Sequence, residues 1–225
     1  MAGNGLTQNQ VSNTDQKLWT ANFILIFLST LSVYIAFHSL LPTLPIYIEQ
    51  LGGSKGIAGL ALAFLTIAAV IIRPVTGWAL DNYGRKIILA VGLVIFLIPS
   101  MTFITMVGIF PLLILRLVQG IGWGLGNTSQ VTVASDIIPP KRLGEGLGFF
   151  SLTISISLAI APAIGLWLID AFSFQALFFT SSMLTVASLF FAMMIKYPKH
   201  PIRTSKTKLV LIEKMALRPS IIILL

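Results

Sequence analysis

Long apolar stretches separated by short polar segments repeat along this chain of 225 residues. A bilayer core about 30 Å thick needs roughly 20 apolar residues, each contributing about 1.5 Å of helical rise. Stretches of that length lie near residues 18–41, 57–80, 87–107, 110–134, 146–169 and 172–195. Each is predicted to be a membrane-spanning helix.

The composition agrees with a lipid environment. Hydrophobic residues make up 56% of the chain and charged residues only 10%, against about 25% charged in a typical soluble domain. The chain has no Cys and two His, which excludes disulfides and thiolate metal sites and argues against a zinc centre. We expect no metal or other cofactor.

The placement of the cations predicts the orientation. Arg85, Lys86, Lys141 and Arg142 lie between the second and third and between the fourth and fifth spans, and seven further cations follow the sixth span, whereas the opposite loops carry only Lys55. Lys and Arg near span ends are retained in the cytoplasm. We therefore expect a multi-pass cell-membrane protein with a cytoplasmic N-terminus. The net charge of +8 is spread between apolar runs, which argues against nucleic-acid binding.

The pattern divides the chain into four parts. They are a cytoplasmic tail (1–17), a six-helix transmembrane bundle (18–195), a basic cytoplasmic linker (196–218) and an apolar end (219–225). The apolar end is too short to span a bilayer, so we expect it to be the truncated start of a seventh helix. The linker could bind anionic lipid headgroups or only set topology.

The fourth span carries a polar stripe. An intramembrane arginine costs about 2.5–3.5 kcal/mol on insertion scales, so Arg116 should face the bundle interior or a wet cavity. Gly120, Trp123 and Asn127 follow Arg116 on one helical face, and Gln119 flanks it. The stripe predicts a substrate or proton pathway. The alternative is a buried structural cation that is satisfied by carbonyls and holds helices together without touching substrate.

The first span carries a second stripe, in which Thr30, Tyr34 and His38 are spaced four residues apart. His38 can change charge near neutral pH. Tyr34 and His38 are therefore candidates for proton or substrate handling, although a lone histidine is also compatible with a structural role.

Small residues and a proline predict close packing. Gly120 and Gly124 form a GxxxG pair that lets helix backbones approach closely. In the fifth span, Pro162 lies between Ala161 and Gly165 and is expected to kink the helix.

The turn between the second and third spans groups small and charged residues. Gly77 can admit a neighbouring helix, Gly84 permits a positive φ, and Asp81 can cap the next helix or pair with a cation. Arg85 and Lys86 follow directly. The plain interpretation is a tight turn whose charges set topology.

These residues, in the order Gly-x3-Asp-x2-Gly-Arg-Lys, resemble the loop signature of the major facilitator superfamily, with Asn82 where that family usually has a cation. The fourth span resembles the family's Arg-x2-Gln-Gly signature. The segment from Ser157 through Pro162 to Gly165 is similar to the family's antiporter signature, although Ser157 and Ala161 replace glycines.

The resemblance implies an all-α membrane protein, a six-transmembrane-helix bundle that is the N-terminal half of a major facilitator fold built from 3+3 inverted repeats. It also implies that Gly77, Asp81, Gly84, Arg85 and Lys86 form a conformational latch. In the latch, Gly77 and Asp81 pack against the other half. Asp136, at the end of the fourth span, could join Arg85 or Arg142 in the same network.

The function implied is secondary active transport, with proton-coupled efflux of a small drug-like molecule by alternating access. The proton gradient is the expected energy source. The expected partners are a small-molecule substrate, the bilayer and a C-terminal six-helix half. The alternative is a non-transporting truncated or split-gene fragment that needs a partner half. An enzyme is not expected, because no span carries paired acids or metal-ligand spacing, and no ATP-binding Gly-x4-Gly-Lys motif occurs.

Overall fold

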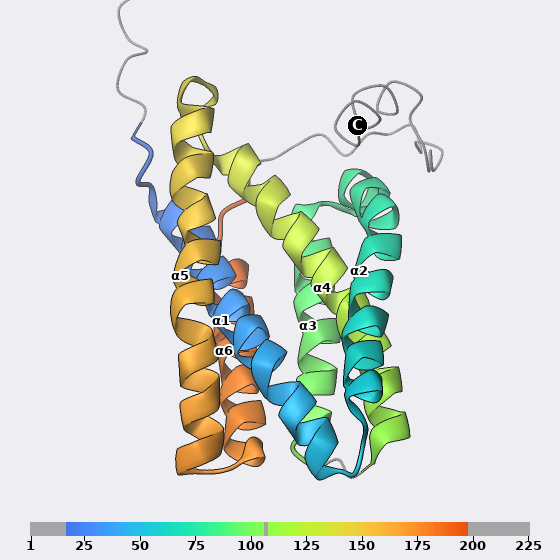
Figure 1. Ribbon diagram of the computed structural model, residues 1–225. Coiled ribbons are helices and arrows are strands. Elements are labelled where there is room, and N and C mark those ends of the chain that lie inside the picture. Colours follow the sequence, from blue (N-terminus) through green and yellow to red (C-terminus); the bar gives the residue numbers. More distant parts are fainter. Residues whose placement is uncertain (1–16, 106–107, 198–225) are drawn as a thin grey trace, which may run out of the picture.

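The computed structural model describes residues 17–105 and 108–197, which form a bundle of long helices (Figure 1). They are α1 (Ala21–Gln50), α2 (Lys55–Tyr83), α3 (Arg85–Thr102), α4 (Ile109–Ile137), the short η1 (Pro140–Arg142), α5 (Leu143–Ala171) and α6 (Phe174–Met194). The six α-helices are each long and apolar enough to cross a membrane, which confirms the predicted spans. Most of the predicted tail and linker, and all of the apolar end, lie outside the described residues.

Local sequence explains where several helices begin. The hydroxyls of Thr20, Ser54 and Ser173 each accept a hydrogen bond from a first-turn backbone N–H, at 3.2, 3.4 and 3.2 Å, as helix N-caps do. Gly84, between α2 and α3, has φ +88°, which confirms the predicted positive φ. Its lack of a Cβ makes this sharp turn possible.

Two observed helix ends differ from the predictions. Helix α1 continues to Gln50, past Pro42 and Pro45, instead of ending near residue 41. Neighbouring helices can support a proline-containing span, and α5 packs closely here: a Cβ on Gly165 would lie 2.6 Å from the Ser39 carbonyl oxygen. Helix α3 ends at Thr102 rather than near 107, because the chain then enters a turn in which Thr105 N–H donates to the Thr102 carbonyl.

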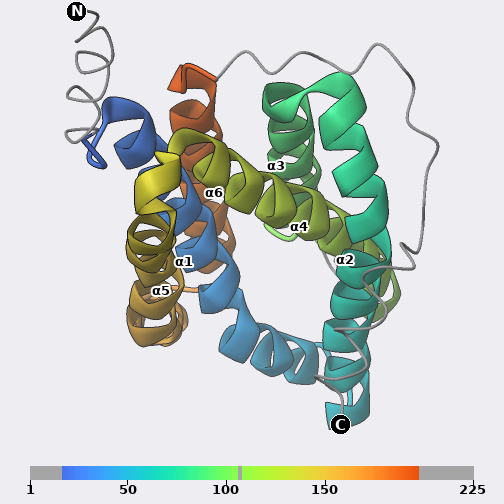
Figure 2. The same ribbon diagram turned by 90° about the horizontal axis from the view of Figure 1, so that it is seen from above.

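Helix α4 is wedged between α2 and α3 (Figure 2). A Cβ on Gly120 would lie 2.9 Å from Ala68 Cβ, and one on Gly124 would lie 2.6 Å from the Ala69 carbonyl oxygen, both on α2. A Cβ on Gly122 would overlap the backbone of Phe96 on α3. The GxxxG spacing therefore does bring helix backbones into contact, on both sides of α4.

The packing follows an internal symmetry. Helix α1 packs on α5 and α6, and α4 packs on α2 and α3. If the first three helices are exchanged with the last three, these pairs map onto one another, and the pairs α3 with α6 and α1 with α4 are unchanged. The smaller contacts also exchange: α1 with α2 becomes α4 with α5, and α2 with α3 becomes α5 with α6. Since α1 and α4 run in opposite directions across the membrane, this is the arrangement of 3+3 inverted repeats. It makes α1 and α4 the central helices.

The outer surface is apolar. Large side chains such as Ile71, Phe110 and Phe190 are 68%, 73% and 61% exposed, whereas many Ser, Thr and Gln side chains are buried between helices. A soluble domain has the reverse distribution. The chain is thus a multi-pass membrane protein. We call the end that carries Arg85, Lys86, Lys141 and Arg142 the basic end, and the other the opposite end.

Candidate functional site

Four predicted pathway residues meet where α1 crosses α4. The Tyr34 hydroxyl donates to Asn127 Oδ1 over 3.3 Å, and the Tyr34 ring centroid lies 5.3 Å from that of Trp123. His38, one turn along α1, has its ring centroid 5.7 Å from that of Tyr34. With Ser157 of α5, these residues form what we call the central polar cluster.

Ser157 links α5 to the histidine on α1. Its hydroxyl oxygen lies 2.8 Å from His38 Nδ1 and 2.8 Å from the Ile154 carbonyl oxygen. The single hydroxyl proton serves one of these two acceptors at a time, so the contact fits either neutral tautomer of His38: Nδ1–H donating to the serine oxygen, or the serine hydroxyl donating to Nδ1.

An aromatic pair covers one side of this cluster. The Phe37 ring stacks on Trp123 with a centroid distance of 3.8 Å and an interplanar angle of 10°. Phe96 of α3 lies 5.8 Å from Trp123. Trp123 therefore contacts both α1 and α3 at this level of the bundle.

A second polar group ties α4 to α3. Arg116 Nη1 donates to Gln119 Oε1 over 2.7 Å, and Gln119 Nε2 donates to Ser100 Oγ over 3.1 Å. Both amide atoms of Gln119 are therefore used within the protein. Arg116 is only 4% exposed, and its Nε has no hydrogen-bond partner among the described residues. The acceptor for Arg116 is the side-chain carbonyl of Gln119, and no backbone carbonyl of the described chain accepts from it, so both the pathway role and the structural alternative stay predictions.

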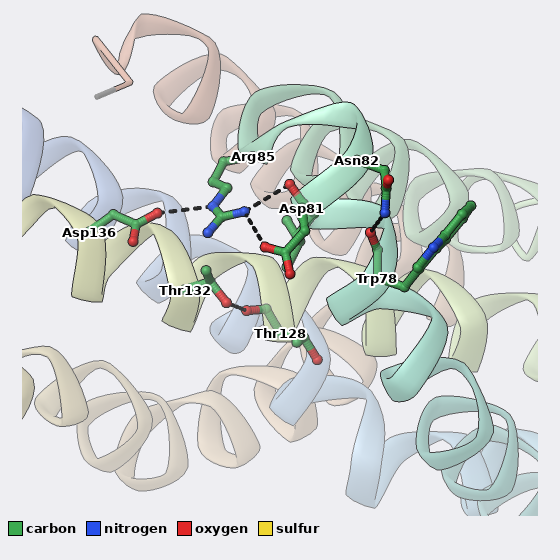
Figure 3. A network of polar contacts seen from close by, with 8 residues as sticks. Trp78, Asp81, Asn82, Arg85, Thr128, Thr132 and Asp136 are labelled. Carbon is green, nitrogen blue, oxygen red and sulfur yellow. Dashed lines mark hydrogen bonds and ion pairs between the residues drawn. The ribbon is translucent and has the colours of Figure 1, made fainter. Parts of the chain in front are cut away.

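At the basic end, Arg85 connects the turn to α4 (Figure 3). Its Nη1 donates to Asp81 Oδ1 over 2.9 Å and to the Leu80 carbonyl over 2.8 Å, and its Nε donates to Asp136 Oδ2 over 3.1 Å. Asp136 therefore lies with Arg85, whereas Arg142 pairs with Glu145. Asp81 pairs with the cation and does not cap α3, which has no side-chain cap.

The other turn residues lie apart from this network. A Cβ placed on Gly77 would have no heavy atom within 4 Å. No helix in the described part of the chain therefore approaches Gly77 as closely as we expected. Lys86 is exposed and makes no ion pair with a described residue. Asn82 donates to the Trp78 carbonyl of its own helix over 2.7 Å.

The small residues of α5 allow it to pack closely against α1. Ala161 and Gly165 are buried, and Pro162 lies within an unbroken helix. Sequence reasoning treated Ser157 only as a replaced glycine and missed its contact with His38. The available signal was a serine that faces the same way as Ala161, one turn away. Ser100, the acceptor for Gln119, gave no comparable signal.

Comparison with known proteins gives a consistent result. The model of the Major Facilitator Superfamily matches residues 24–225. The Quinolone resistance protein NorA of Staphylococcus aureus is 24% identical over 177 residues, which are 79% of this chain and 45% of that protein. Multidrug resistance protein 3 of Bacillus subtilis is 29% identical over 162 residues, 72% of this chain and 31% of that protein. The chain thus spans less than half the length of these relatives.

Proposed function

This chain belongs to the Major Facilitator Superfamily, and on that premise we propose that it forms one six-helix half of a secondary transporter. The transporter exports a small drug-like molecule by alternating access, driven by the proton gradient. It carries out no chemical conversion and needs no cofactor. It lies in the cell membrane, with the basic end in the cytoplasm.

One observation carries the proposal. The buried side-chain atoms that lack a hydrogen-bond partner among the described residues are Thr30 Oγ1, Arg116 Nε and the amide atoms of Gln130. All belong to α1 and α4, the two central helices. Buried polar groups are normally paired, and polar side chains within spans mark solute pathways. Unpaired groups confined to the central helices support a pathway along them.

The names of the relatives support export. One is described as a quinolone resistance protein and one as a multidrug resistance protein. We extend drug efflux from them to the transporter to which this chain contributes. The two relatives are more than twice as long as the part that matches this chain, which supports a second six-helix unit as partner. The space beside Gly77 leaves room for a helix of that unit. The Arg85 network next to Gly77 serves as the latch that holds and releases that unit.

The proposed proton path includes His38. Protonation of His38 charges a ring that is packed against Tyr34 and hydrogen-bonded to Ser157. A positive charge inside a span is costly unless water or a counter-charge reaches it. Protonation would therefore favour a conformation in which the α1–α5 contact opens, which links proton uptake to helix movement.

The test is drug flux in proteoliposomes with an imposed pH gradient, with a quinolone and a cationic dye as substrates. The chain alone should give no gradient-driven flux, and the chain with its second six-helix unit should give flux that a protonophore abolishes. Flux from the chain alone would contradict the half-transporter proposal and also exclude the partner-dependent fragment. Flux that survives the protonophore would exclude proton coupling.

In the complete transporter, His38→Gln at equal abundance should flatten the pH dependence of flux between about pH 5 and 8.

A further inference from the structure

A cavity of about 340 Å³ opens at the opposite end of the bundle, between α1 and α2, with Arg116 of α4 in its wall. Small-molecule sites typically measure about 300–1,000 Å³. Arg116 lies seven residues into α4, about 10 Å along its axis. A larger hollow of about 530 Å³ lies beside Trp167, but its charged residue, Asp170, is exposed. Of these two hollows, the Arg116 cavity is the one that contains a buried charge.

The Arg116 guanidinium has unused donors. It carries five N–H groups and is always charged, yet its hydrogen bond within the described chain goes from Nη1 to Gln119. Nε is enclosed by protein and unpartnered. Nη2 is not enclosed in this way and makes no hydrogen bond to a described residue, and a charged N–H forms a strong hydrogen bond to a carboxylate. Among the described residues, the Arg116 guanidinium also lies 5.8 Å from the centroid of the Phe103 ring.

No carboxylate neutralises Arg116 within the described residues. Among the described residues, Asp81 and Asp136 pair with Arg85, and Glu145 pairs with Arg142. None of these acids pairs with Arg116. Leaving a buried charge unpaired costs several kcal/mol. An anion that enters the cavity would therefore recover a large electrostatic penalty, which favours anionic ligands over neutral or cationic ones of the same size.

The rest of the wall is mostly apolar. Leu41, Leu44 and Pro45 line it from α1, and Ala58 and Leu62 line it from α2. Two exposed charges, Glu49 and Lys55, stand on the same wall near the helix ends. A ligand with a carboxylate at one end and an apolar body would match Arg116 and the leucines at once.

We propose that this cavity binds a small amphipathic organic anion, with its carboxylate on Nη2 of Arg116 and its apolar body against Leu41, Leu44 and Leu62. The proposal rests on the proposed transport function only in calling this anion a substrate. Binding itself needs no second six-helix unit, since α1, α2 and α4 supply the whole lining.

The experiment measures equilibrium binding of dansyl-undecanoic acid to the full 225-residue chain in nanodiscs made of uncharged lipid. The methyl ester of the same probe and a dansyl amine of similar length are the neutral and cationic controls. We expect saturable binding of the acid, at least about tenfold tighter than that of either control. Equal binding of acid and ester would overturn the proposal and indicate simple partitioning into lipid.

Variants identify the residue. Arg116→Gln should abolish saturable binding, and Arg116→Lys, which keeps the charge but lacks the Nη2 donor, should weaken it about tenfold or more. Lys196→Gln removes an exposed cation at the basic end and should change nothing. Unchanged binding in Arg116→Gln would contradict the assignment.

Two exposed positions keep the proposal testable if Arg116 variants misfold. Glu49→Gln should tighten binding of the acid about two- to fivefold, and Lys55→Gln should weaken it by a similar factor. The opposite signs, or no effect of either change, would show that no anion binds here. Anion binding without drug flux would count against the proposed function alone. Flux of a cationic dye without anion binding would count against this inference alone.

Discussion

At the scale of single residues, Arg85 makes hydrogen bonds at the basic end to Asp81, to Asp136 and to the Leu80 carbonyl. It joins the α2–α3 turn to α4 through Asp81 and Asp136, and its side chain is 20% exposed. Arg142 makes a shorter bond, 2.6 Å, to Glu145, but both partners are well exposed and three residues apart on one segment. The two arginines therefore differ in what they hold together.

Arg85→Gln should lower the free energy of unfolding by about 1–2 kcal/mol, because it removes the partly buried ion pairs that join Asp81 and Asp136 through Arg85. Arg142→Gln should have a smaller effect, because solvent screens that exposed pair. Thermal unfolding in detergent, followed by tryptophan fluorescence, compares the two. Equal losses would mean that Arg85 adds nothing beyond a surface ion pair.

At the scale of helices, the glycines of α4 determine how close it lies to α2. Gly120→Leu should destabilise the bundle by about 1–3 kcal/mol or more, because the side chain would collide with α2 at Leu65 and Ala68. Gly148→Leu, in α5, is the matched control, because no heavy atom lies within 4 Å of its built Cβ. The same unfolding assay measures both. A Gly120 variant as stable as the Gly148 variant would disprove the tight α2–α4 contact.

The existence of the helices was easier to predict than their contacts. The spans follow from apolar length, and the positive φ of Gly84 follows from its place in a short turn. Helix α1 ran past Pro42 because packing by α5 supports it, and no local pattern reports that support. The bond between His38 and Ser157 joins residues 119 positions apart. The sequence shows that Ser157 faces the same way as Ala161, but only the fold shows that this face meets His38. The roles of the latch and pathway residues stay predictions.

At the scale of the whole molecule, the empty space at Gly77 indicates where a second six-helix unit would pack. Gly77→Trp should leave the stability of this chain alone nearly unchanged, since nothing lies within 4 Å of a Cβ there. It should reduce co-purification of the second unit severalfold, because a large side chain would block helix approach. Ile71→Trp, at a 68% exposed position on another face of α2, is a control for added bulk on the same helix. Normal co-purification of the Gly77 variant would show that the second unit packs at another surface.

The pairing of α1 with α5 and α6 also has a consequence for biosynthesis. Ser29 and His38 emerge from the ribosome long before Ser188 and Ser157, which follow 159 and 119 residues later. At about 5–20 residues per second, α1 waits between about 6 and 30 s for these partners. Its polar side chains then need shelter in the insertion machinery, so photo-crosslinks from α1 of stalled nascent chains should persist until α5 has been made. Release of α1 into lipid before that point would show that it tolerates the wait unaided.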